Sequence, residues 1–142
     1  MNISYHEKSI WIILATTLLI FGGYFFLAFK FIASPIIPDF PLIPLFVVTI
    51  VVYVIIQSVL QAGLALFHLQ EADAKEDERD TLIELKATRI SYFVLVFGVW
   101  VAGFSMFQYS SPLVMANIMM FFFVLAEVVG YGLELYYYRR GV

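Results

Sequence analysis

Residues 90–126 read ISYFVLVFGVWVAGFSMFQYSSPLVMANIMMFFFVLA and contain no charged side chain. As one helix, these residues would reach about 55 Å at about 1.5 Å per residue, whereas the hydrocarbon layer of a bilayer is about 30 Å thick. The run must therefore fold back on itself, and residues 108–112 (Gln-Tyr-Ser-Ser-Pro) form the turn that it contains. The stretch predicts two membrane helices. They cover about residues 77–107, of which about 87–107 cross the bilayer, and about 112–136.

The first half of the chain shows the same pattern. Two long apolar segments, at about 9–31 and 42–67, flank residues 34–41, which contain three prolines. Proline cannot donate a hydrogen bond in a helix interior and disfavours helix in the residue before it, so this segment predicts an extended turn between two more membrane helices.

The composition favours the same conclusion. Apolar residues make up 63% of the 142 residues and charged residues 13%, against roughly 45–50% and 25% in globular chains. A water-soluble core could not hide so much apolar surface, so lipid must act as part of the solvent. We expect an all-α integral membrane four-helix bundle that forms a single transmembrane domain over residues 1–142. Its first partner is the lipid bilayer.

Lysine and arginine orient this bundle. Seven of the eight basic residues fall on one side of the expected spans, namely Lys8, Lys75, Arg79, Lys86, Arg89, Arg139 and Arg140. Only Lys30 falls on the other side. By the positive-inside rule, both termini and the central loop are expected in the cytoplasm, with the third helix extended into the cytoplasm beyond the bilayer.

Residues 71–89 hold seven acids and four bases, which accounts for the whole net charge of −3. An acidic loop repels phosphate, so nucleic acid is not expected as a partner. The stretch Asp77, Glu78, Arg79 and Asp80 lies at the start of the third helix. It is our candidate docking surface for a cytoplasmic or membrane protein partner. A solvated helical extension without a partner is the plainer alternative.

Glu127 lies in the inner half of the fourth helix. A charged carboxylate in a membrane span is costly, so such residues usually face the bundle interior and often mark ion or proton paths. At about 100° per residue, Asn117, Tyr131 and Glu134 share roughly its face, and Gln57 and Gln61 form a polar stripe on the second helix. These residues predict a polar seam between the second and fourth helices.

Two interpretations of this seam remain open. In one, Glu127 takes up and releases a proton. In the other, Glu127 is neutral or paired, with Arg89 and Gln61 as candidate partners, and holds helices together or extends its carboxyl to the interface. Glu134 is expected at the interface, because Arg139 and Arg140 follow it closely.

The sequence shows no pattern of a catalytic or cofactor site. It contains no glycine-rich phosphate loop, zinc-protease motif or nucleophile elbow. There are no cysteines and only two histidines, so we expect no enzymatic activity, no cofactor and no metal.

Several segments resemble one family. They are residues 5–11, 71–73, 77–80 (Asp-Glu-Arg-Asp), 115–117 and 138–141. Over nearly its whole length the chain is similar to a family of small uncharacterised bacterial four-helix inner-membrane proteins with an acidic DERD-type central loop. The resemblance implies a multi-pass protein of the bacterial cytoplasmic membrane. Genes of such proteins often lie near small helix-turn-helix regulators, and this aspect of the resemblance implies a regulatory or stress-linked role.

The leading hypothesis is therefore a non-enzymatic regulatory or accessory (scaffold) membrane protein with a cytoplasmic acidic docking helix. The alternative is a small proton-coupled transporter or channel subunit that uses Glu127. The alternative calls for a homo-oligomer, because one four-helix unit encloses little space.

Overall fold

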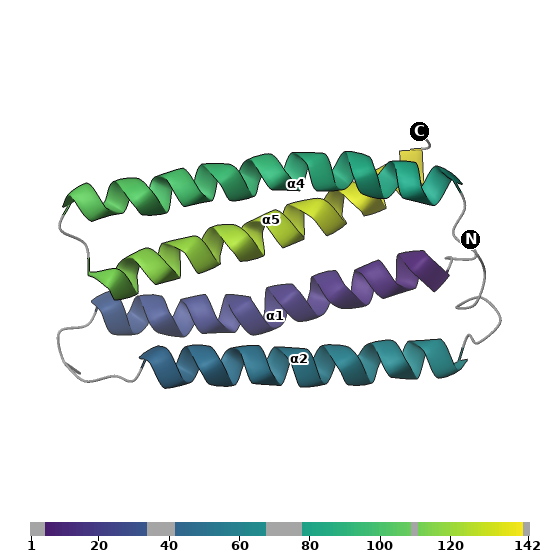
Figure 1. Ribbon diagram of the computed structural model, residues 1–142. Coiled ribbons are helices and arrows are strands. Elements are labelled where there is room, and N and C mark those ends of the chain that lie inside the picture. Colours follow the sequence, from purple (N-terminus) through teal and green to yellow (C-terminus); the bar gives the residue numbers. More distant parts are fainter. Residues whose placement is uncertain (1–4, 34–41, 68–77, 109–110, 141–142) are drawn as a thin grey trace. The chain divides into compact units, whose positions relative to one another are not determined.

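The computed structural model describes residues 5–33, 42–67, 78–108 and 111–140. Within these residues the chain forms four long helices, α1 (Tyr5–Ala33), α2 (Leu42–Phe67), α4 (Glu78–Ser105) and α5 (Pro112–Arg140), and one short 3₁₀ helix, η1 (Met106–Gln108) (Figure 1). The described part contains no strand. The expected all-α fold is confirmed.

All four long helices are long and apolar enough to cross a membrane, at Tyr5–Lys30, Ile43–Phe67, Glu78–Gln108 and Pro112–Arg140. At least 25 residues of helix span about 37 Å, which exceeds the hydrocarbon thickness of about 30 Å. The first and last helices are longer than the expected ranges of about 9–31 and 112–136. Helical hydrogen bonding does not have to stop where the apolar segment stops, so these helices continue into their polar flanks.

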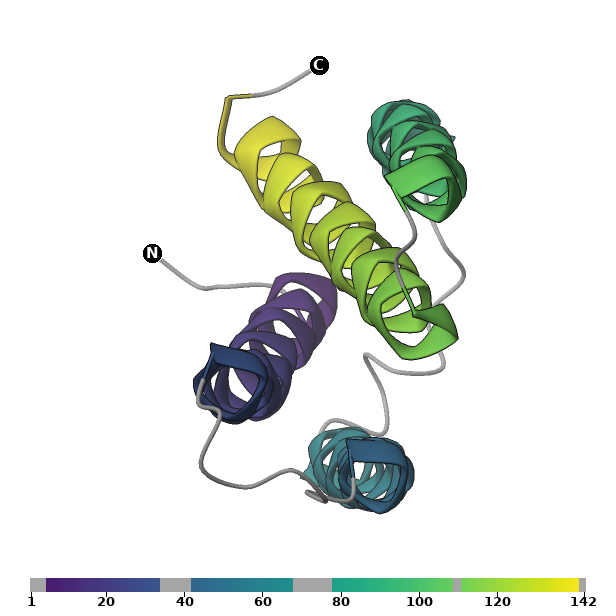
Figure 2. The ribbon, with the colours of Figure 1, turned by 90° about the vertical axis from the view of Figure 1, so that its left-hand side faces the viewer.

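The contacts divide the chain into two units, Met1–Ala74 and Lys75–Val142. Each unit is an antiparallel helical hairpin, α1 with α2 and α4 with α5, as both views of the ribbon show (Figures 1 and 2).

The α1–α2 hairpin is joined by polar side chains. Side-chain hydrogen bonds that cross it join Ser9 Oγ to Gln61 Oε1 (2.8 Å), Thr16 Oγ1 to Gln57 Oε1 (2.7 Å), and Thr17 Oγ1 to Tyr53 Oη (3.0 Å). Gln61 Nε2 also donates to the Ser9 backbone carbonyl at 3.4 Å. Helix association in lipid lacks a hydrophobic driving force, so such bonds and close packing take its place. Ring contacts of Phe21 with Tyr53 and of Tyr24 with Phe46 complete the same interface.

The α4–α5 hairpin is joined mainly by small side chains. Ala87, Gly98 and Ala102 are buried on α4, and Ala126 and Gly130 are buried on α5. Small residues let two helix backbones approach closely, which increases van der Waals contact. Ile83 is fully buried one turn before Ala87 and extends this packing toward the start of α4.

The start of α5 follows its sequence signals. The backbone N–H of Val114 donates to Ser111 Oγ at 3.4 Å, and Pro112 is the first helical residue, where a missing N–H costs nothing. Ser111 therefore caps the N-terminus of α5.

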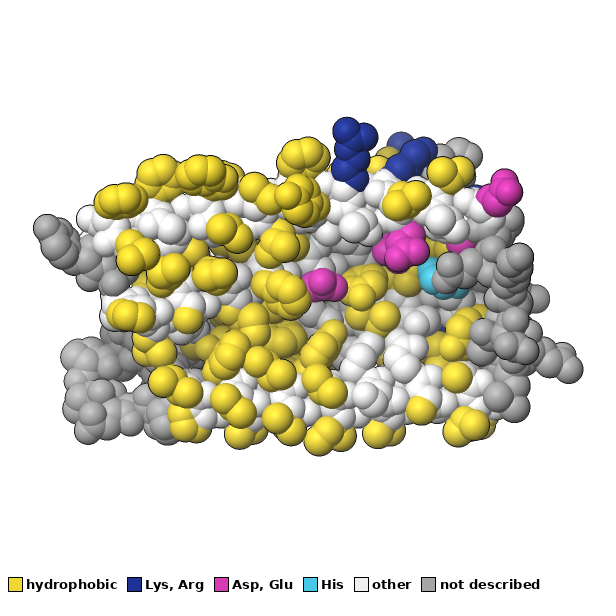
Figure 3. All heavy atoms as spheres, viewed as in Figure 1, with side chains coloured by type: hydrophobic (Ala, Val, Ile, Leu, Met, Phe, Trp, Pro, Cys, Tyr) yellow, Lys and Arg dark blue, Asp and Glu magenta, His cyan; other side chains and the backbone are white. Residues whose placement is uncertain are grey.

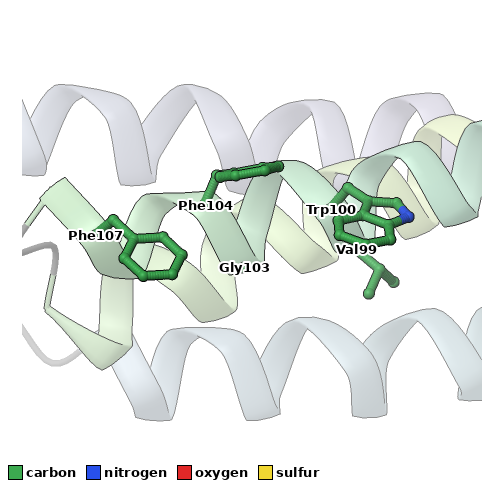
Figure 4. A pocket seen from close by; sticks show the side chains of 5 residues that line it. All are labelled: Val99, Trp100, Gly103, Phe104 and Phe107. Carbon is green, nitrogen blue, oxygen red and sulfur yellow. The ribbon is translucent and has the colours of Figure 1, made fainter.

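Apolar side chains cover most of the described surface in the space-filling view. On α4, the basic side chains lie toward the end at which the helix begins (Figure 3). Further along α4 and in η1, a shallow groove of about 300 Å³ is lined by Val99, Trp100, Gly103, Phe104 and Phe107 (Figure 4). Its walls are almost wholly apolar, as expected for a surface in contact with lipid acyl chains.

Candidate functional site

A polar recess of about 230 Å³ lies between α4 and α5. Two sets of side chains line it, both from the Lys75–Val142 unit. They are Glu84, Thr88 and Ser91 from α4, and Glu127, Gly130, Tyr131 and Glu134 from α5.

Helical periodicity places each set on one face. Glu84, Thr88 and Ser91 are spaced four and three residues apart, as are Glu127, Tyr131 and Glu134. Residues at such spacings lie on one side of a helix. Because α4 and α5 are antiparallel, the first half of α4 meets the second half of α5, and the two polar stripes face each other.

Gly130 makes room for this recess. A Cβ atom at this position would contact Ser91 Cβ at 3.4 Å and Ser91 Oγ at 3.5 Å. Any larger side chain would fill the space between the two stripes. The Ser91 hydroxyl itself donates to the Thr88 backbone carbonyl at 3.4 Å.

Glu134 is the most buried of the three recess carboxylates. It is 8% exposed, while Glu127 is half-buried and Glu84 is exposed. Within the described part of the chain, Glu134 makes no hydrogen bond or ion pair. A buried carboxylate usually has a partner, because removing a charge from water is costly. The lack of one among the described residues is the least usual feature of the recess.

A hydrogen bond also joins the two helices near the start of α4 and the end of α5. Tyr138 Oη donates to Asp80 Oδ1 at 2.8 Å, which connects the first turn of α4 to the last turns of α5. Asp80 was expected as part of the docking surface, and its carboxylate accepts this internal bond. Glu78 and Arg79 are exposed, and Asp77 lies outside the described residues.

The other residues of the expected seam have the following positions. Gln57 and Gln61 hydrogen bond to Thr16 and Ser9 of α1. Asn117 donates to the Leu113 carbonyl of its own helix at 2.8 Å and is not among the residues that line the recess. Glu127 and Tyr131 line it together. The seam between the second and fourth helices stays a prediction.

Sequence reasoning missed three residues of α4, namely Glu84, Thr88 and Ser91. It did not foresee that the Glu134 side chain is buried, and the expected position of Glu134 at the membrane interface stays a prediction. The repeated four-three spacing of polar residues on α4 and α5 is the sequence pattern from which these recess residues could have been predicted.

Among the described residues, no group of three or more histidines or acids is arranged to hold a metal ion.

Comparison with known proteins identifies a family for this chain. The family model described as "Predicted membrane protein (DUF2178)" matches residues 6–142. The chain belongs to this family. Membership and the four apolar helices together make this DUF2178 chain a membrane protein. No curated protein and no solved structure matches it.

Proposed function

We propose that this protein is a small, non-enzymatic, proton-coupled transporter or channel subunit in which the recess carboxyls take up and release protons. The observation that carries the proposal is the convergence of Glu84, Glu127 and Glu134 on one recess between two helices that are apolar enough to span a membrane.

Charge balance supports this function. Three carboxylates share the recess, and none of its described lining residues is a lysine or arginine. Uncompensated negative charge in a partly buried recess is costly. Protons or other cations from solution can neutralise the charge of the recess carboxylates. The exchange of one such cation for another at the carboxylates is the elementary step of proton-coupled transport.

The hydroxyls of the recess support the same step. Thr88, Ser91 and Tyr131 line the same recess as the carboxyls, and hydroxyls both donate and accept hydrogen bonds. A proton can therefore pass from one carboxyl to the next through hydroxyl or water bridges without crossing apolar surface.

The test is proton flux in vesicles. We expect wild-type protein in liposomes with an entrapped pH dye to acidify the interior when a potassium diffusion potential, negative inside, is imposed. Glu127→Gln should lower the initial rate by about tenfold or more, because it removes a group that transfers protons. Glu78→Gln, an exposed carboxyl of the same α4 helix, should leave the rate unchanged. A wild-type rate equal to that of empty vesicles would exclude the proposal.

For location, we propose the cytoplasmic membrane of a bacterium, with both termini and residues 68–77 on the cytoplasmic side. The distribution of lysine and arginine supports this orientation. A homo-oligomer would supply the further helices that a conduction path requires.

A second candidate is a regulatory or accessory scaffold that binds a partner through the acidic start of α4. The exposure of Glu78 and Arg79 favours it. Charge reversal at Asp77 and Glu78 should then abolish co-purification of the partner, while reversal of the exposed Arg89 should not. Partner binding that survives the acidic reversals would rule this candidate out.

A further inference from the structure

A second, mainly apolar recess lies next to the polar one. This recess of about 150 Å³ shares Thr88, Ser91 and Glu127 with the first. Its remaining walls are Tyr92, Leu95, Phe123 and Ala126. Glu127 therefore stands at the border between a space lined by carboxyls and a space lined by aromatic and aliphatic side chains.

The carboxyl half lacks a positive partner. Glu134 is nine-tenths buried, lines the recess and is unpaired within the described part of the chain. Glu127 and Glu84 add two more carboxyls to the same space. A positively charged group placed there would meet three acids and no lining lysine or arginine.

The apolar half favours an organic ligand over a bare ion. An inorganic cation makes no favourable apolar contact with Leu95 and Phe123, whereas a hydrocarbon group can bury apolar surface against both side chains. Aromatic faces also attract cations, so Tyr92 and Phe123 suit a ligand whose charge lies next to its apolar part.

We propose that these two neighbouring recesses together bind a small amphipathic organic cation, with an ammonium group among Glu84, Glu127 and Glu134 and a hydrocarbon group against Tyr92 and Phe123. This inference names the substrate class of the site and rests on the proposed function for the coupling to protons. Volumes of about 230 and 150 Å³, each smaller than most ligand pockets, suit a small ligand such as a single-ring or short-chain amine.

The coupling is an ion exchange. When the ammonium group enters, a protonated carboxyl loses its O–H proton to water, and the resulting carboxylate balances the ligand charge. No covalent bond to the ligand forms or breaks. Release of the ligand reverses the step and takes the proton back.

Benzyltrimethylammonium is the probe, because its charge is permanent and its ring matches the apolar half. Its carbon isostere, neopentylbenzene, has the same shape without the charge. Isothermal titration of the full chain in detergent, corrected with empty micelles, should show saturable binding of the cation and none of the isostere. Equal uptake of both compounds would mean simple partitioning and would overturn the inference.

Variants locate the site. Glu127→Gln and Phe123→Ala should each weaken cation binding by about tenfold, the loss expected for one charged or aromatic contact. Glu78→Gln and Phe107→Ala, which replace residues outside both recesses, should bind as the wild type does. Circular dichroism checks that each variant is folded. A folded Glu127→Gln with wild-type affinity would also overturn the inference.

A pH indicator in weakly buffered solution separates the two proposals. Cation binding accompanied by proton release supports both. Saturable binding without proton release supports the ligand class and contradicts proton coupling. Proton flux in vesicles without saturable cation binding overturns this inference and leaves the proposed function standing.

Discussion

Tyr138 and Asp80 are 58 positions apart in the sequence, yet their side chains join the two ends of one hairpin. The acceptor is a carboxylate in the first turn of α4, where negative charge also interacts favourably with the helix dipole. The hydroxyl donor comes from one of three consecutive tyrosines, Tyr136, Tyr137 and Tyr138. Of these, Tyr136 is exposed and packs against Arg140 and Tyr137.

At this scale we predict that Tyr138→Phe lowers the free energy of unfolding by about 1 kcal/mol, because it removes a hydrogen bond and leaves the Asp80 carboxylate without its donor. Thermal unfolding in detergent, followed by circular dichroism, measures the loss. Tyr136→Phe is the matched control and should change little. Equal effects of the two variants would show that the bond to Asp80 does not stabilise the hairpin.

The two hairpins use different means to hold their helices together. In α1–α2, hydroxyl and amide groups bond across the interface, at about 0.6 kcal/mol for each bond between membrane helices. In α4–α5, glycine and alanine bring the backbones close. At Gly98 the two helices come especially close, because a Cβ atom at this position would overlap Phe122 Cβ and Cγ. Phe97 packs edge to face on the same Phe122 ring, with centroids 5.8 Å apart.

We therefore predict that Gly98→Ala separates α4 from α5 and costs about 1–3 kcal/mol of stability. The clash involves atoms near the Phe122 backbone, so a change of rotamer cannot relieve it. Gly103→Ala, on the same helix, has no atom within 4 Å of the new Cβ. That control should be neutral or gain up to about 1 kcal/mol from helix propensity. Unfolding of both variants at the wild-type temperature would contradict the packing argument.

For the whole molecule, the antiparallel course of α4 and α5 puts the start of one helix and the end of the other on the same side of a membrane. The positive-inside rule assigns that side to the cytoplasm. The chain contains no cysteine, so single substitutions to cysteine report on single positions without background.

We predict that Arg79→Cys and Arg140→Cys react with a membrane-impermeant maleimide only after cells are permeabilised. Gln108→Cys, in η1 at the other end of the hairpin, should react in intact cells. All three positions are exposed, so accessibility depends on the side of the membrane. Labelling of positions 79 and 140 from opposite sides would disprove the topology.

The sequence by itself determined the fold class and the four long helices. The length of each apolar segment, the positions of the prolines and the polar residues around Ser111 can all be read directly from the sequence. They are sufficient to locate membrane helices, because a bilayer selects helices by length and hydropathy. The sequence also showed that the Glu127 carboxylate is costly to place in a membrane, but not which residues surround it.

Only the tertiary structure decided which side chains meet. Periodicity tells which residues share a helix face, but the rotation of that face toward its neighbour depends on packing, here on Gly98, Gly130 and the alanines between α4 and α5. For this reason Glu84 and Glu134 joined Glu127 in one recess, and Gln57 and Gln61 took partners on α1. A site formed by two helices requires both faces in place, which a linear sequence does not give.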